Sequence, residues 1–169
     1  MTAVTDLPDL VVEPLNRAEM RVLFPLVQMA EPDLDLARWL TYATKLSRRR
    51  DGRAGILVAR RVVRRFPCGV VCFRQYEDLR FGTVLMAEHM VAVDPIDPQS
   101  VLLALAEQLD VTARALGCTA VRVLIPDAKA TVELRRVGHE GEGAVMIRAL
   151  PPMVSEPKRP PRKTAQLPR

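Results

Sequence analysis

The chain has 169 residues, of which 49% are hydrophobic and 27% charged, and it carries a formal net charge of +5. This length is typical of one globular domain that buries a core of its own. Its apolar runs, such as Val101–Ala106, are too short to cross a bilayer, which excludes a membrane protein. The N-terminus shows no secretory signal and the three cysteines have no metal-type spacing, so we expect a reduced, cytoplasmic protein.

The positive charge is concentrated in two segments. Residues 155–169 hold five basic residues and one acid, which is +4 of the total, so the rest of the chain carries about +1. Residues 1–35 hold seven acids against two arginines, whereas residues 45–65 hold eight arginines and one lysine against Asp51 alone. We call these eight arginines the arginine-rich corner: Arg48, Arg49, Arg50, Arg53, Arg60, Arg61, Arg64 and Arg65.

Two interpretations of the arginine-rich corner remain open. It could dock an acidic protein partner or phosphates. It could equally form a solvated hairpin that neutralises the acidic N-terminal third, within one molecule or across a homodimer. Nucleic-acid binding is not expected, because Phe66 is almost the only aromatic residue beside these arginines.

The N-terminal third predicts one strand and two helices. Val11–Leu15 is a short apolar run that is typical of an edge strand. Asn16 suits a helix N-cap, with Glu19 at the spacing of a capping box, and Pro25 should interrupt the helix that follows. After a break at residues 31–33, apolar residues at helical spacing predict a second helix: Leu36, Trp39, Leu40, Ala43 and Leu46.

The rest of the chain predicts strands and one long helix. The strand-type runs are Ala54–Ala59, Cys68–Phe73, Thr83–Val93, Ala120–Ile125 (expected to be buried) and Ala144–Leu150, with a short helix or turn at residues 126–137. The long helix should begin after Asp97 as N-cap, with Pro98 in its first position, and end before Gly117. Cys68 and Cys72 should lie on one face of their strand, about 13 Å apart and too far for a disulfide.

This order of elements predicts an α/β fold with one mixed sheet and helices on both faces. The order, with VAVDP before the long helix, ARALGCTAVRVLIP through the next strand and ATVELRRVGHE before the last one, resembles the GNAT superfamily of acyl-CoA-dependent N-acyltransferases. The resemblance covers roughly residues 10–150 and implies a mostly antiparallel sheet. We therefore expect an N-terminal extension over residues 1–9, a GNAT-like domain over 10–150, and a disordered tail over 151–169 with six prolines and basic residues between them.

The resemblance also implies a site for acetyl-CoA or another acyl-CoA. In that family the strand before the long helix splays from its neighbour and its backbone pairs with pantetheine; the corresponding residues are Met90, Val91, Ala92 and Val93. The loop that enters the helix holds the pyrophosphate, which adds Gln99, Ser100 and Val101. Here this loop has no glycine and no basic residue, and a capping Asp97 puts a carboxylate where the family puts a phosphate.

For catalysis the resemblance implies Glu88 as the base that deprotonates the amine. His89 follows it and is expected on the opposite face of the strand. The family's tyrosine acid corresponds to Leu134, which cannot donate a proton, and His139 replaces a common aromatic residue. Glu88 and His89 are thus the catalytic candidates; the alternatives are a surface glutamate paired with an arginine and a structural histidine.

Two functional hypotheses follow. The first is a divergent N-acyltransferase that transfers an acyl group from acyl-CoA to a small-molecule or protein amine. The alternative is a catalytically inactive protein of the same fold that binds or regulates a partner through the arginine-rich corner or the basic tail.

Overall fold

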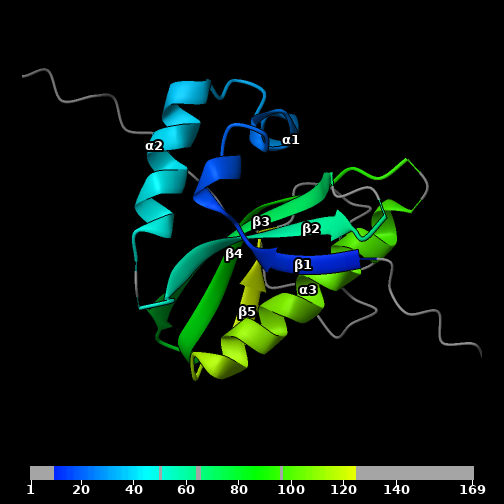
Figure 1. The fold of residues 1–169 in the computed structure, drawn as a ribbon. Coiled ribbons are helices and arrows are strands. Elements are labelled where there is room, and N and C mark those ends of the chain that lie inside the picture. The colour runs from blue at the N-terminus through cyan, green and yellow to red at the C-terminus, as the bar shows by residue number, and fades with distance from the viewer. Residues whose placement is uncertain (1–9, 50, 64–65, 96, 125–169) are drawn as a thin grey trace, which may run out of the picture.

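The computed structural model describes residues 10–49, 51–63, 66–95 and 97–124, which form one mixed five-stranded sheet with helices packed on it (Figure 1). The elements, in chain order, are β1 (Leu10–Pro14), a 3-10 turn (Arg17–Glu19), α1 (Phe24–Ala30), α2 (Leu36–Ser47), β2 (Ala54–Arg61), β3 (Pro67–Asp78), β4 (Gly82–Ala92), α3 (Pro98–Ala115) and β5 (Ala120–Val123). The strands lie in the order β1-β2-β3-β4-β5, and every neighbouring pair is antiparallel except β4 and β5. The α/β class and the mostly antiparallel sheet are thereby confirmed.

Some predictions fall outside the described residues and stay predictions. They concern the extension over residues 1–9, the turn at 126–137, the strand Ala144–Leu150, the side chains of Leu134 and His139, and the tail over 151–169. Among the described residues, no helix is long and apolar enough to cross a membrane.

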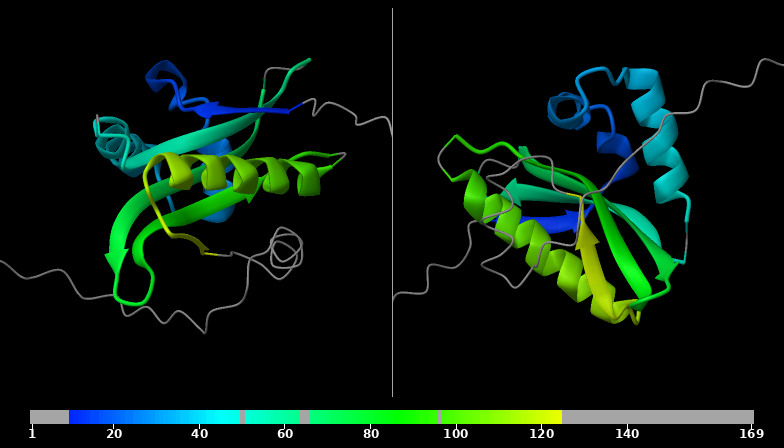
Figure 2. Two further views of the ribbon diagram at one scale, coloured as in Figure 1. Left: turned by 90° about the horizontal axis from the view of Figure 1, so that it is seen from below. Right: turned by 180° about the vertical axis from the view of Figure 1, so that it is seen from behind.

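Helices lie on both faces of the sheet (Figure 2), and under them each face carries a hydrophobic core. Helix α3 covers one face, where Leu105 and Leu109 are completely buried against strand residues that include Leu85. Helices α1 and α2 cover the other face, where Trp39 packs with Val70 and is almost fully buried. The expectation that helices lie on both faces of the sheet, drawn from the order of elements, is confirmed.

Local signals explain where the helices begin. Asn16 Oδ1 accepts from the Ala18 N–H and caps the 3-10 turn. Pro25 stands in the first turn of α1, where its missing N–H costs nothing, so the helical run is split there as predicted. Asp35 caps α2, because its Oδ1 accepts from the backbone N–H of Arg38 at 2.8 Å.

The long helix α3 has the predicted ends. Asp97 Oδ1 accepts from the Ser100 N–H at 3.0 Å, and Pro98 is the first helical residue. Gly117 follows the last turn with φ +70°, a left-handed conformation that a side chain would strain. The next strand, β5, is half-buried along all four residues, so the prediction of a buried strand is wrong for this part.

One strand irregularity overturns the expectation for the two cysteines of β3. The pairing of β2 with β3 shifts register between Ala59↔Gly69 and Arg60↔Pro67, which leaves Cys68 as an extra residue. Such a bulge reverses the alternation of side chains along the strand. Cys68 therefore packs in the core under α3, whereas Cys72 packs in the core under α1 and α2. The two thiols lie on opposite faces.

Candidate active site

A second bulge, in β4, turns Glu88 and His89 to the same side of the sheet. Between the pairs Val70↔Val91 and Cys72↔Glu88, two steps along β3 are matched by three steps along β4, so β4 holds one extra residue. Within this stretch His89 has φ +52°, a conformation that only a few per cent of non-glycine residues adopt. The expectation that His89 faces away from Glu88 is wrong, because it assumed regular alternation. Both side chains contact residues of the α1–α2 side.

The Glu88 carboxylate is held by two side chains. Its Oε2 accepts from Arg74 Nη2 at 2.5 Å and from the Tyr42 hydroxyl at 3.5 Å. Burial, with the nearby Cys72 and Glu88, raises the pKa of Tyr42, so the phenol stays protonated and can donate. Glu88 is thus paired with an arginine, and a substrate amine would compete with Arg74 for this carboxylate.

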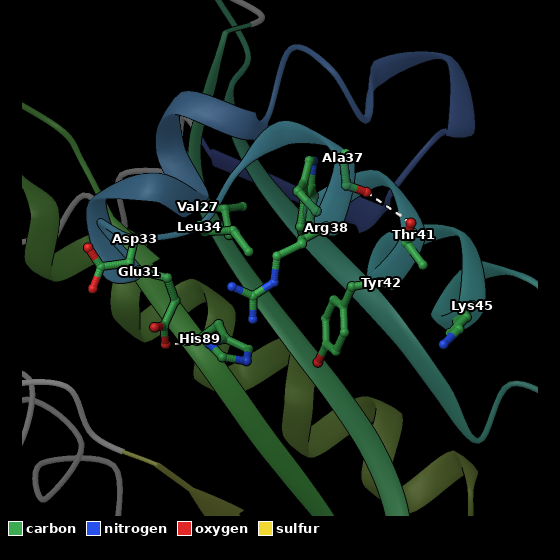
Figure 3. A pocket seen from close by; sticks show the side chains of 11 residues that line it. Val27, Glu31, Asp33, Leu34, Ala37, Arg38, Thr41, Tyr42, Lys45 and His89 are labelled. Carbon is green, nitrogen blue, oxygen red and sulfur yellow. Dashed lines mark hydrogen bonds and ion pairs between the residues drawn. The ribbon is translucent and has the colours of Figure 1, made fainter. Parts of the chain in front are cut away.

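Beside Glu88, His89 contacts a second carboxylate, that of Glu31. Its Nδ1 lies 3.0 Å from Oε1 of Glu31, just after α1, and its ring meets the ring of Tyr42 edge-on with centroids 5.8 Å apart (Figure 3). An ionised carboxylate only accepts, so Nδ1 carries the proton in this contact. In the neutral imidazole the lone pair is then on Nε2, which no side chain or backbone group of the described residues binds. The contact with Glu31 therefore leaves Nε2 of the neutral imidazole as a proton acceptor.

Glu31, Tyr42 and His89 line a cavity of about 700 Å³ between α1, α2 and β4, whereas Glu88 lies outside its lining. Its apolar lining includes Val27, Leu34 and Trp39. Its charged and polar lining consists of Glu31, Asp33, Arg38, Thr41, Tyr42, Lys45 and His89. Figure 3 shows Arg38, Tyr42 and His89 pointing into the space between α2 and the strands. A cavity of this size and mixed lining is typical of a small-molecule site.

Next to the bulge, one edge of β4 has no partner strand among the described residues. Strand β4 pairs with β5 from Val84↔Ala120 to Ala87↔Val123, and the Leu124 N–H adds one bond to the Ala87 carbonyl. Beyond that point, β4 residues up to Ala92 pair with β3 on their other side, but no described strand pairs with them on the β5 side. The predicted cofactor residues Met90, Val91 and Ala92 lie on this stretch; Val93 follows it, and its N–H donates to the Cys68 carbonyl.

The α3 N-terminus is already occupied by carboxylates of the chain itself. Asp97 accepts from both the N–H and the hydroxyl of Ser100, and these bonds lower the pKa of its carboxyl group. Asp94 Oδ1 accepts from the Asp97 N–H at 3.0 Å, and its Oδ2 pairs with Arg61 Nε at 2.7 Å. Of the other predicted contacts, Gln99 is exposed and Val101 is a buried core residue. The usual cradle of free N–H groups for a pyrophosphate is absent from the described part of this loop.

Part of the arginine-rich corner is neutralised within the molecule. Arg60 pairs with Glu19 of the acidic N-terminal third at 2.5 Å, and Arg61 pairs with Asp94. Arg49 lies 3.9 Å from Asp51. These contacts favour the solvated, self-neutralising interpretation for the arginines named here; Arg50, Arg64 and Arg65 lie outside the described residues.

The sequence analysis missed Glu31, Tyr42 and the charged residues of α2. The chain did carry a signal for α2: Arg38, Thr41, Tyr42 and Lys45 recur at positions i, i+3, i+4 and i+7. They form a polar stripe on one face of the helix, beside the apolar stripe of Trp39 and Ala43. The contact of Glu31 with His89 joins residues 58 positions apart and had no local signal.

This mixed, mostly antiparallel sheet with helices on both faces is the fold that the resemblance to the GNAT N-acetyltransferases implied. Solved structures of that class confirm the fold. An aminoglycoside N-acetyltransferase in complex with CoA matches with a TM-score of 0.69 and 12% identity over 83% of this chain and 93% of its own. Glucosamine-6-phosphate N-acetyltransferase from Arabidopsis thaliana matches with a TM-score of 0.63 and 11% identity over 83% and 97%.

Ribosomal-protein-alanine N-acetyltransferase from Brucella melitensis is similar as well, with a TM-score of 0.66 and 15% identity over 83% of this chain and 99% of that one. No protein-family model matches the sequence, and a search of curated proteins finds no relative. The fold is therefore established from tertiary structure, at identities too low to transfer an activity.

Proposed function

We propose that the protein is an N-acyltransferase that takes an acyl group from acetyl-CoA or another acyl-CoA and transfers it to an amine bound in the cavity between α2 and β4. The bulge in β4 carries this proposal, because it brings His89 to the cavity and Glu88 to the same side of the sheet, next to the end of the described pairing with β5. The similarity to N-acetyltransferases, one of them in complex with CoA, supports it at the level of the fold.

The described residues suit the pantetheine part of acyl-CoA but do not suit its pyrophosphate. The edge of β4 at Met90–Ala92, which no described strand pairs on the β5 side, offers backbone groups that suit the amides of pantetheine. The α3 N-terminus does not suit the pyrophosphate, because Asp97 and Asp94 already bind its N–H groups and would repel an anion. We therefore expect the donor to be held mainly along β4, and with reduced affinity for its diphosphate.

The acyl donor would supply a thioester whose C–S bond breaks as the C–N bond forms, with CoA leaving as a thiolate that is protonated by water. The residues of this chain prepare the amine. His89 Nε2 accepts the proton of the attacking amine, and Glu31 fixes the tautomer through Nδ1 and stabilises the imidazolium that results. Glu88 contributes its negative charge to an incoming ammonium group while Arg74 and Tyr42 hold it in place. In this assignment His89 is the base, and Glu88 positions the amine.

Two matched variants test these roles. His89→Asn removes the imidazole but keeps a residue type that tolerates a positive φ. We expect kcat for acetyl transfer to fall about a hundredfold or more. Glu88→Gln should lower kcat/KM by less than tenfold. A His89→Asn enzyme within threefold of the wild type would remove His89 from the mechanism.

The alternative of a catalytically inactive protein has one observation in its favour, the self-capped α3 N-terminus. A thermal shift with acetyl-CoA, desulfo-CoA and pantetheine separates the two. At a hundredfold excess over Kd a ligand stabilises by about 2.7 kcal/mol, which is a shift of several degrees for a domain of this size. The absence of any shift at millimolar ligand would favour the inactive binding protein.

A further inference from the structure

Helix α2 presents a charged stripe to the cavity. Arg38 and Lys45 stand seven residues apart, about 10 Å along the helix axis, with Thr41 and Tyr42 between them. Arg38 and Lys45 are exposed, and Figure 3 shows the Arg38 side chain extending from α2 into the opening. The stripe gives one side of the cavity two cationic groups.

Acidic side chains line the same cavity. Glu31 and Asp33 come from the segment that joins α1 to α2, and the Glu31 carboxylate contacts His89 Nδ1. The cavity is therefore lined by both signs of charge, with a carboxylate at the imidazole and cations along α2. A ligand with a single sign of charge would satisfy only one of these two sets of groups.

Among the described residues, the two cations of the stripe have no ion-pair partner, unlike Arg60 and Arg74. Within the described residues, no carboxylate lies within ion-pair distance of Arg38 or Lys45. By contrast, Arg60 and Arg74 each pair with a glutamate at 2.5 Å. Two unpaired cations that line one cavity are therefore available to an anion from outside.

We propose that the acyl acceptor is a small amine that also carries an anionic group, a carboxylate or a phosphate. Its amine lies beside His89 Nε2, on the side of the ring away from Glu31, and its anion points toward the Arg38 guanidinium and the Lys45 ammonium. This inference rests on the proposed function and names the substrate class of the same cavity. A polycationic amine would place positive charge against Arg38 and Lys45 and is disfavoured.

Two pairs of probes, each with the same amine and with or without the anion, test this class: glucosamine 6-phosphate against glucosamine, and alanine against alaninamide. Binding to the full-length protein is measured by calorimetry without acyl donor, and acetyl transfer is measured separately. We expect the anionic member of at least one pair to bind about tenfold or more tightly than its neutral partner. The pair that responds distinguishes a phosphate from a carboxylate.

The variants Arg38→Gln and Lys45→Gln assign the preference to the stripe. Each should reduce the preference for the anionic probe at least threefold and leave the neutral probe unchanged. Arg48→Gln is the matched control, because it removes the same charge from an exposed position just after α2 that does not line the cavity. An equal loss in Arg48→Gln would show a general effect of net charge and overturn the assignment.

The remaining outcomes separate this inference from the proposed function. Anion-dependent binding without any acetyl transfer supports the inference about the ligand and refutes the acyltransferase. Acetyl transfer without any preference within either pair overturns the inference and keeps the acyltransferase. Failure of all four probes to bind at 10 mM also overturns the inference.

Discussion

The substitution Asp97→Asn at the start of α3 tests whether the Asp97 carboxylate weakens binding of the CoA diphosphate. Asparagine caps a helix about as well as aspartate, and its side-chain oxygen can still accept from the Ser100 N–H. The substitution therefore removes the negative charge and retains the helix. The carboxylate also has a stabilising role, since it interacts with the helix dipole and accepts from the Ser100 hydroxyl.

The magnitudes follow from these two roles. Loss of the charge–dipole interaction and of one charge-assisted hydrogen bond should lower the free energy of unfolding by about 1 kcal/mol. Removal of a like charge beside a diphosphate should improve CoA binding by about 1–2 kcal/mol, or roughly five- to thirtyfold in Kd. Pantetheine, which has no diphosphate, should bind with unchanged affinity. The substitution should thus weaken the fold and strengthen donor binding.

The assays are urea unfolding and calorimetry with CoA and with pantetheine. Glu107→Gln, on the same helix and exposed, is the control for loss of charge. Because the pKa of Asp97 is lowered in the folded state, its stabilisation is present at neutral pH and is lost as the pH falls through the folded pKa. Unfolding of Asp97→Asn should therefore depend less on pH below about pH 4. Unchanged or weaker CoA binding would refute our account of the loop.

Two further predictions concern the cores. Gly69→Ala should cost about 1–3 kcal/mol in urea unfolding, because its Cβ would stand 2.5 Å from a Val101 methyl group. The cost should shrink in a Val101→Ala background, and strict additivity would contradict the clash. Trp39→Phe should cost about 2–3 kcal/mol, since Trp39 Nε1 donates to the buried Met20 carbonyl at 2.6 Å. Phe66→Leu at an exposed site should cost under about 0.5 kcal/mol; a Trp39→Phe protein as stable as this control would show that the bond contributes nothing.

The local elements could be predicted because their signals lie within a few residues of one another. The amphipathic period of α2, and the residues Asp97, Pro98 and Gly117 around α3, act through backbone geometry and nearby hydrogen bonds. The same local rules predicted that a carboxylate would occupy the α3 N-terminus. The order of these elements was also enough to predict the sheet and the class of fold.

The composition of the candidate site was decided by the tertiary structure. A regular strand alternates its side chains, so Glu88 and His89 were assigned to opposite faces, and Cys68 and Cys72 to one face. One extra residue in β4 and another in β3 reversed both assignments. Where a bulge falls depends on how neighbouring strands register against each other, which no local pattern in this chain encodes.

By itself the sequence determined the helices, the strands and their capping, because those depend on interactions between near neighbours in the chain. Only the tertiary structure decided that Glu31 meets His89 and that Arg38 and Lys45 line the same cavity. These contacts depend on where α1 and α2 settle on the sheet, and that placement is set by packing of buried side chains such as Trp39 from distant parts of the chain.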